Sequence, residues 1–315
     1  MKIKQLVEKS IRQKTLFTDA FGYSLTKTGF ADKYLAGQLT MYKAYSWLKT
    51  HFEKELDKIQ NDNSWEEAYT KAEKRVWICW FQGMEKAPKI VQECYQSVCY
   101  WMKNWKITVI TADNMNEYVK FPDFILEKWR AGIISNTHLS DLLRIELLIR
   151  YGGLWLDSTT YLTGKMPSYI IDSDFFVYRN GWMDMEMINM GSWLIYSEYT
   201  NNRLLCETQK LLYDYWKKYD YIKNYFLLHM FFRMVTDANP ALWEKVPLIN
   251  HIDSHLLMQD LPKAYNEDRC RQIMKLTSVH KLTYKVETRL KRQLNQRRSS
   301  WGGCFRIREN RDENI

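Results

Sequence analysis

A strand–helix–strand pattern in residues 76–111 most constrains how this chain can fold. The apolar run 76–81 (Val-Trp-Ile-Cys-Trp-Phe) is typical of a buried strand. Pro88 stands where the first residue of a helix is favoured, and this helix is predicted to extend to about Asn104. A second apolar run, 107–111, follows it. Two strands joined by a helix are expected to pair in parallel through a right-handed crossover, so the sequence predicts an α/β protein.

The rest of the chain alternates in the same way. Amphipathic periodicity predicts further helices at 47–59, 122–130, 138–150, 202–219 and 223–236. Short apolar runs predict further strands at 154–156, 175–178 and 192–196. The pattern therefore predicts a central sheet wrapped by helices.

Charge is unevenly distributed along the chain. The formal net charge of +9 divides into +4 for residues 1–14, +8 for residues 271–315 and −3 for the long stretch between them. A mildly acidic body lacks the basic face of a nucleic-acid-binding protein, so no nucleic-acid partner is expected. The basic ends suggest peripheral attachment to an anionic membrane surface, with a solvated tail as the alternative. The cluster on the C-terminal side comprises Arg289, Lys291, Arg292, Arg297 and Arg298.

The sequence also bears on the cellular compartment. No uncharged apolar run approaches the ~18–20 residues that span a bilayer, and the first residues lack the apolar core of a signal peptide. The six cysteines are scattered without metal-binding spacing, which is typical of reduced thiols. The expected location is therefore the cytoplasm, including the inner face of the plasma membrane.

Ligands of open α/β sheets bind beyond the carboxyl ends of the strands, which directs attention to Asp157. This residue follows the predicted strand 154–156, and two glycines precede that strand. Asp141 and Arg144 lie three positions apart on a predicted helix and hence on one face. Structural roles remain open as alternatives: an intrahelical ion pair for Asp141 and Arg144, and a turn cap for Asp157.

The combination of these residues resembles a known family. The segment 140–144 (Ser-Asp-Leu-Leu-Arg), followed by 151–157 (Tyr-Gly-Gly-Leu-Trp-Leu-Asp), is similar to the sugar-nucleotide core of family 32-type glycosyltransferases, and especially to their capsular-polysaccharide-synthesis branch. Residues 76–83, Asn189–Trp193 and 280–283 (His-Lys-Leu-Thr) resemble further blocks of that family in matching order. The likeness covers roughly residues 75–285.

This resemblance implies a GT-A fold, which is a Rossmann-like α/β domain with a mostly parallel sheet. The implied domain occupies residues 73–288 and includes a helical insertion at 202–260. Residues 1–72 are then a helical N-terminal extension, and residues 289–315 a basic C-terminal tail.

The resemblance also implies roles for individual residues. Catalytic roles are implied for Asp157, Asp141 and Arg144. A sugar-nucleotide donor is expected to contact Asp141 and Arg144, with Trp77 or Trp80 against its base. Since those two tryptophans lie three apart on a strand, at most one is expected at the base and the other in the core. The implied donor contacts also include Gly153, Asn189, Gly191 and Lys281, although Asn189 and Gly191 are equally compatible with a structural turn.

A divalent metal, Mn²⁺ or Mg²⁺, is implied at Asp157, with Thr159 and His280 as further ligands. The wider family has Asp-x-Asp at this place, whereas this chain has Asp157-Ser158-Thr159. The second carboxylate is therefore missing. A polar surface role is the alternative for His280.

The implied activity is that of a metal-dependent, retaining hexosyltransferase. The donor would be a nucleotide sugar, such as a UDP-sugar, and the acceptor a glycan or a polyprenyl-diphosphate-linked sugar of a capsular or surface polysaccharide. The alternative is a catalytically impaired sugar-nucleotide-binding or scaffold protein of the same assembly system.

Overall fold

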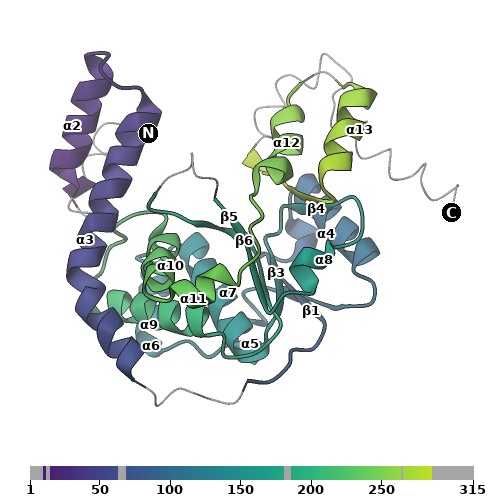
Figure 1. The fold of residues 1–315 in the computed structure, drawn as a ribbon, viewed down its shortest axis with the longest axis horizontal. Helices are drawn as coiled ribbons and strands as arrows, with labels where there is room; N and C mark the ends of the chain where they lie inside the picture. Colours follow the sequence, from purple (N-terminus) through teal and green to yellow (C-terminus); the bar gives the residue numbers. More distant parts are fainter. Residues whose placement is uncertain (1–9, 12–14, 63–68, 181–185, 264, 286–315) are drawn as a thin grey trace, which may run out of the picture.

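A five-stranded sheet lies at the centre of the computed structural model, with helices on both of its faces (Figure 1). The structure describes residues 10–11, 15–62, 69–180, 186–263 and 265–285. The strands are β1 Arg75–Cys79, β2 Lys106–Ile110, β3 Gly153–Leu156, β4 Thr160–Leu162, β5 Phe175–Arg179, β6 Met190–Ser197 and β7 Val279–Lys281. The helices are α2 Leu16–Lys27, α3 Lys33–Asn61, the 3₁₀ turn η2 Met84–Lys86, α4 Lys89–Trp101, α5 Met115–Tyr118, α6 Asp123–Arg130, α7 Asn136–Tyr151, α8 Ser168–Ile171, α9 Arg203–Lys218, α10 Leu227–Ala238, α11 Pro240–Glu244, α12 Ile252–Asp260 and α13 Glu267–Leu276.

The strand order of the sheet is β2-β1-β3-β6-β5. Strand β1 pairs in parallel with both β2 and β3, which confirms the predicted strand–helix–strand unit. Strand β6 runs antiparallel to both β3 and β5, so the sheet is mixed and the expectation of a mostly parallel sheet is confirmed only in part. The physical reason is the connection between β5 and β6. Residues 180–189 are too few for the crossover that parallel neighbours require.

Side chains alternate between the two faces of the sheet and divide the core in two. Trp77, Trp155 and Ile195 lie in a cluster that includes side chains of α3, α7, α9 and α10. Their strand neighbours, such as Leu154 and Leu194, lie in a second cluster with side chains of α4 and α8. Both faces of the central strands are therefore buried, as expected when helices cover both sides of a sheet.

Helices α2 and α3 form a hairpin whose upper part stands clear of the body (Figure 1). The Asp32 carboxylate caps α3 by accepting a hydrogen bond from the Leu35 amide at 2.8 Å. Further along α3, Leu48 and Phe52 are fully buried and belong to the main core cluster. The second half of α3 is thus part of the body. The predicted basic helix at residues 1–14 and the tail at residues 289–315 fall almost entirely outside the described residues.

The sequence did not predict β4 and β7, which form a separate two-stranded sheet. Each strand has three residues, too few for a period-two pattern to be recognised. Their antiparallel pairing sets Thr160 opposite Lys281. It brings residues near the C-terminal end of the described chain against the turn that follows β3.

Two sequence expectations concern the compartment. In the described part of the chain, no helix combines the length and the apolar character that crossing a membrane requires. Cys79, Cys94 and Cys99 are free thiols, whereas Cys270 is disulfide-bonded. The expectation that all cysteines are reduced is therefore wrong for Cys270.

Candidate active site

A cavity of about 710 Å³ opens beyond the carboxyl ends of β1 and β3. Three groups of residues form the wall of the cavity. The first follows β1, the second lies on α7 and after β3, and the third is at the end of β7 and just after it. The polar and charged side chains of the lining include Gln82, Lys86, Asn136, Thr137, Ser140, Arg144, Asp157, Ser158, Thr159, His255, Lys281, Thr283 and Lys285. The location agrees with the rule that ligands of open α/β sheets bind at this edge.

Asp157 lies at the centre of this edge because it ends β3. The preceding strand residues are all buried, and the Asp157 amide donates a hydrogen bond to the Trp193 carbonyl at 2.8 Å. Its own carbonyl accepts from the Thr160 amide at 2.9 Å and thereby closes the turn into β4. The backbone is thus fixed on both sides, while the side chain keeps 26% of its surface exposed. The carboxylate is therefore held firmly and faces the cavity.

Lys281 approaches Asp157 from β7. Its Nζ donates to Asp157 Oδ2 at 2.8 Å and to Thr159 Oγ1 at 2.6 Å. Because Lys281 stands opposite Thr160 in the β4–β7 pair, the register of these short strands places its ammonium between the two side chains. The Leu282 amide adds a hydrogen bond to the Thr159 carbonyl at 2.9 Å.

Arg144 approaches Asp157 from α7 on the other side. Its Nη1 lies 3.4 Å from Asp157 Oδ1 and donates to both the carbonyl and the hydroxyl of Ser192, at 2.6 and 2.9 Å. The guanidinium also lies over the Trp155 ring, 5.0 Å from its centroid. With only 6% of its side chain exposed, Arg144 is a fixed cation rather than a mobile one.

Asp141 lies behind Arg144. Its Oδ1 is 3.2 Å from Arg144 Nη2 and its Oδ2 is 3.3 Å from His138 Nδ1, and the residue does not line the cavity. The intrahelical ion pair that the sequence left open is therefore present. In this arrangement Asp141 acts on the cavity through Arg144, whose orientation it helps to fix.

The electrostatics keep Asp157 ionised. Burial by itself raises the pKa of this carboxyl, but the positive charges of Lys281 and Arg144 and the hydrogen bonds from Lys281 and Trp155 outweigh it, so the pKa lies below its ordinary value. Tyr225, which also lines the cavity, has a raised pKa because of its burial and the nearby carboxylates of Asp141 and Asp157. Near neutral pH the site therefore holds an anionic Asp157 between two cations.

The two predicted tryptophans separate as strand alternation requires. Trp80 lines the cavity, its ring lies edge-on to Tyr284 with centroids 5.7 Å apart, and its buried Nε1 has no hydrogen-bond partner among the described residues. Trp77 is fully buried in the core, where its Nε1 donates to the Gly152 carbonyl at 2.9 Å. Trp80 is thus the tryptophan that can meet a ligand, and the donor contact predicted for Trp77 does not fit its position.

Three more predicted donor contacts lie away from the cavity lining. Gly153 begins β3, at the opposite end of that strand from Asp157, with φ +90°. A Cβ atom on it would lie 2.7 Å from the Arg75 carbonyl oxygen, so glycine here allows β3 to approach β1. Asn189 is buried and donates to Thr236 Oγ1 at 2.7 Å. A Cβ atom on Gly191 would lie 2.9 Å from Trp193 Nε1. All three positions fit structural roles.

His280 points away from the site. It is fully buried, its Nε2 lies 3.1 Å from Thr163 Oγ1, and burial lowers its pKa to about 4. Strand alternation explains this position, because its neighbour Lys281 faces the cavity and His280 must face the other side. The predicted metal-ligand role of His280 therefore does not fit its placement, and neither does a surface role.

The remaining predicted ligands do not form a metal site on their own. Within the described ranges, no three His, Cys, Asp or Glu side chains come together to hold an ion. Of the predicted set, Asp157 and Thr159 are adjacent, but the Lys281 ammonium bonds to both of them. One carboxylate already paired to two cations is a poor donor set for Mn²⁺ or Mg²⁺, which bind through several oxygen ligands.

The structure adds residues that sequence reasoning missed. Lys86, Tyr225 and His255 line the cavity from three separate elements or connections. No sequence signal marks them, since each reaches the cavity only through the packing of a distant segment. Ser192, which accepts two hydrogen bonds from Arg144, lies within the predicted 189–193 block, but its role was not predicted.

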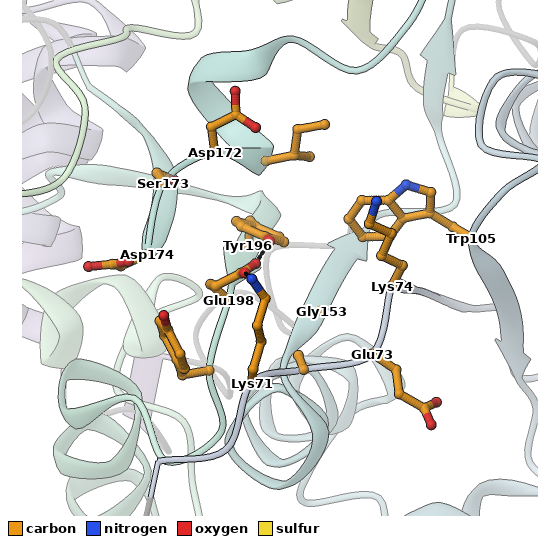
Figure 2. Close-up of a pocket in the computed structure, with 13 residues that line it drawn as sticks. Lys71, Glu73, Lys74, Trp105, Gly153, Asp172, Ser173, Asp174, Tyr196 and Glu198 are labelled. Carbon is orange, nitrogen blue, oxygen red and sulfur yellow. Dashed lines mark hydrogen bonds and ion pairs between the residues drawn. The ribbon is translucent and has the colours of Figure 1, made fainter.

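A second cavity, of about 390 Å³, lies near the amino end of β3 (Figure 2). Its lining includes Gly153 at the start of β3. The Lys71 ammonium forms an ion pair with Glu198 at 2.7 Å, and the Tyr196 hydroxyl donates to the same carboxylate. Because Lys71 and Glu198 already pair with each other, we assign no ligand to this cavity.

The chain is similar to proteins named as glycosyltransferases and to one named as a transferase. The chain is 28% identical over 103 residues to the O-glycosyltransferase braB of Annulohypoxylon truncatum, and 30% identical over 100 residues to the O-glycosyltransferase PaGT of Phomopsis amygdali. These matches cover 29% and 28% of this chain, and the chain spans about a quarter (24%) of the length of each relative. Among solved structures, the PaToxG glycosyltransferase aligns with a TM-score of 0.38 and 13% identity, over 65% of this chain and 85% of that one. A transferase carrying two cysteine-to-serine changes aligns with a TM-score of 0.34 and 12% identity, over 58% and 90%.

The family follows from a longer match. The model of the capsular polysaccharide synthesis protein family matches residues 29–299, which include every residue of the cavity lining. The chain therefore belongs to the capsular polysaccharide synthesis protein family.

Proposed function

We propose that this protein is a glycosyltransferase that moves a sugar from a nucleotide-sugar donor to a glycan or lipid-linked acceptor in surface-polysaccharide synthesis. The observation that carries the proposal is the cavity beyond β1 and β3, where Asp157 is held between Arg144 and Lys281. Membership of the capsular polysaccharide synthesis family and the likeness to O-glycosyltransferases support the same class. A UDP-sugar is the proposed donor.

The charges of the cavity suit an anionic ligand. Its lining holds four cationic side chains and one carboxylate, namely Lys86, Arg144, Lys281, Lys285 and Asp157. The body of the chain is mildly acidic by contrast, so this positive charge is local. A nucleoside diphosphate carries the charge that such a lining attracts, and Trp80 offers an aromatic surface for its base.

The proposed reaction retains the configuration of the donor sugar. The bond between the anomeric carbon and the β-phosphate oxygen breaks, and its electron pair stays with the diphosphate. A bond forms between the same carbon and an acceptor hydroxyl, whose proton passes to the departing phosphate. Fixed cations near the phosphate stabilise the charge that develops on it. No separate general base is required for this step.

The test is donor consumption by the full chain. We expect slow hydrolysis of at least one sugar nucleotide from a panel of UDP-glucose, UDP-galactose, UDP-N-acetylglucosamine and GDP-mannose, assayed with and without Mn²⁺. Asp157→Ala should reduce the rate at least ~100-fold, because Asp157 holds the Arg144 and Lys281 cations that stabilise the departing phosphate. Asp253→Ala is the matched control, because Asp253 is exposed and lies outside the cavity lining. No turnover with any donor, or indifference to Asp157→Ala, rejects the proposal.

The alternative is a sugar-nucleotide-binding or scaffold protein of the same assembly system. The missing second carboxylate after Asp157 is the observation that favours it. This alternative predicts that a donor binds in calorimetry and is returned intact after long incubation. Release of free nucleoside diphosphate rejects it.

We also propose peripheral attachment to an anionic bilayer, where a lipid-linked acceptor would be presented. The basic ends of the chain support this proposal, and so do apolar side chains on the α2–α3 hairpin. Phe17 and Phe30 are 90% and 83% exposed, and Phe21 and Tyr34 are also exposed. Aromatic and basic side chains together favour a charged membrane interface. Equal co-sedimentation with neutral and anionic vesicles would reject the proposal.

A further inference from the structure

The ammonium of Lys281 fills the place that the family resemblance assigns to a divalent cation. Its Nζ bonds to Asp157 Oδ2 at 2.8 Å and to Thr159 Oγ1 at 2.6 Å, and these two residues were the expected metal ligands next to the strand end. The register between β4 and β7 fixes this arrangement in the backbone. The position of the charge is therefore built into the fold.

Both carboxylate oxygens of Asp157 already have partners within the protein. Its Oδ1 faces Arg144 and accepts a hydrogen bond from Trp155 at 3.2 Å, and its Oδ2 is bonded to Lys281. A metal ligated by Asp157 would have to compete with these partners for the carboxylate. The metal would also be repelled by the remaining cations of the lining, which holds only one carboxylate. Both effects oppose the binding of a divalent ion.

The same arrangement can supply the charge that a metal usually supplies. An ammonium has three N–H donors, and within the described chain Lys281 directs two of them to Asp157 and Thr159. Lys281 lines the cavity with 18% of its side chain exposed, so it can reach a bound ligand. Arg144, which is fixed by Ser192 and Asp141, provides a second positive charge beside Asp157.

We propose that this protein binds the diphosphate of its donor, and assists its departure, without a divalent metal, and that Lys281 is the catalytic cation. The inference rests on the proposed glycosyltransferase function. When the anomeric carbon–oxygen bond breaks, the electron pair goes to the β-phosphate oxygen, and the Lys281 ammonium donates a hydrogen bond to the phosphate without losing its proton. The acceptor hydroxyl provides the new bond to carbon, and its proton passes to an oxygen of the departing phosphate.

The experiment measures binding and turnover separately. Binding of UDP and of GDP to the full chain is followed by calorimetry in EDTA and again with Mn²⁺ in place of EDTA. Turnover of the best sugar nucleotide is measured under the same two conditions. The variants are Lys281→Met, which keeps the length of the side chain and removes its charge, and Lys275→Met. Lys275 is the matched control because it is exposed, near the end of α13, and outside the lining. Thermal melts establish that both variants are folded.

We expect EDTA and Mn²⁺ to give binding and turnover that agree within about 3-fold for the unmodified chain. Lys281→Met should weaken binding of the nucleoside diphosphate by at least ~10-fold and slow turnover by at least ~100-fold, in keeping with a lost charge-assisted contact. Lys275→Met should change neither quantity. A Lys281→Met variant that gains a requirement for Mn²⁺ would support the proposal further, since a cation then re-enters the vacated place.

Two results overturn the inference. Turnover that EDTA abolishes and Mn²⁺ restores rejects metal independence while leaving the glycosyltransferase proposal intact. Nucleoside diphosphate binding that needs Mn²⁺, or that is unchanged in a folded Lys281→Met variant, rejects the role of Lys281. If no sugar nucleotide is consumed under any condition, the proposed function fails, and the binding measurements alone still decide which cation holds the diphosphate.

Discussion

The Lys281 ammonium lies 2.8 Å from Oδ2 of Asp157, although 124 positions separate the two residues in the sequence. The contact depends on two short strands, β4 and β7, which lie outside the central sheet. It joins the carboxyl end of β3 to the last described part of the chain. Any ligand that enters the cavity beyond β3 therefore meets a lysine and an aspartate that are already paired.

Arg144→Lys should destabilise the protein as well as inactivate it. The guanidinium bonds to the Ser192 carbonyl and hydroxyl and pairs with Asp141 and Asp157, and a single ammonium cannot reproduce this fork. Leaving these buried groups unpaired should lower the free energy of unfolding by roughly 2–3 kcal/mol. Urea denaturation measures the change. Arg130→Lys, at an exposed position, should stay within about 0.5 kcal/mol, and an equal effect of both changes would contradict the argument.

Replacing Trp77 should mainly lower stability, whereas replacing Trp80 should mainly weaken nucleotide binding. Trp77→Ala removes a fully buried side chain and should cost about 3–5 kcal/mol of stability. Trp80→Ala, at the cavity, should cost much less stability but weaken UDP binding by roughly 10-fold or more if the ring stacks on the base. Calorimetry with UDP and urea denaturation separate the two effects. Unchanged UDP affinity in Trp80→Ala would remove this tryptophan from the donor site.

Gly153→Ala should destabilise the chain, because φ is +90° and the new Cβ would lie 2.7 Å from the Arg75 carbonyl oxygen. Both the strained backbone and the contact oppose alanine, with an expected loss of about 1–3 kcal/mol. Gly37→Ala is the contrasting control, since this glycine lies inside α3 with open space around it. That change should stabilise the helix by roughly 0.5–1 kcal/mol. Thermal denaturation of both variants tests the pair.

His280 should make stability depend on pH. Burial lowers its pKa from 6.5 to about 4, so between these values the unfolded chain binds more protons than the folded chain. The free energy of unfolding should therefore rise as the pH increases from about 4 to 6.5 and then level off. The contribution should reach up to about 3 kcal/mol for a shift of this size.

His229, whose pKa burial also lowers to about 4, adds to the same trend. His280→Gln should reduce the slope of the pH profile and leave the part due to His229, and His51→Gln, at an exposed position, should leave the profile unchanged. Urea denaturation at several pH values gives the profile. A profile that keeps its slope in His280→Gln would contradict this account.

Several features of the fold could be predicted from local sequence alone. The apolar runs at 76–81 and 107–111, with a helix between them, correspond to β1, β2 and α4, because each pattern depends on neighbouring residues. The helix containing Asp141 and Arg144 was predicted for the same reason, and so was the position of Asp157 after β3. Local periodicity and strand ends are enough to place a polar cluster at one edge of a sheet.

The direction of β6 and the existence of β4 and β7 could not be read from the sequence in the same way. Pairing between strands depends on segments far apart in the chain, and three-residue strands carry almost no pattern. The roles of individual residues depended on the same information. Trp77 and Trp80 belong to one apolar run, and His280 and Lys281 belong to one motif, so the sequence does not tell which member of each pair faces the cavity. The structure places Trp80 and Lys281 at the cavity and buries Trp77 and His280.

The sequence by itself determined that this is an α/β chain with a carboxylate and an arginine near a strand end, since these features follow from local pattern. Only the tertiary structure decided what surrounds that carboxylate. The β4–β7 register places Lys281 beside Asp157 and turns His280 into the core, because adjacent strand residues face opposite sides. Long-range pairing thus decides whether the expected metal position contains a cation of the protein itself.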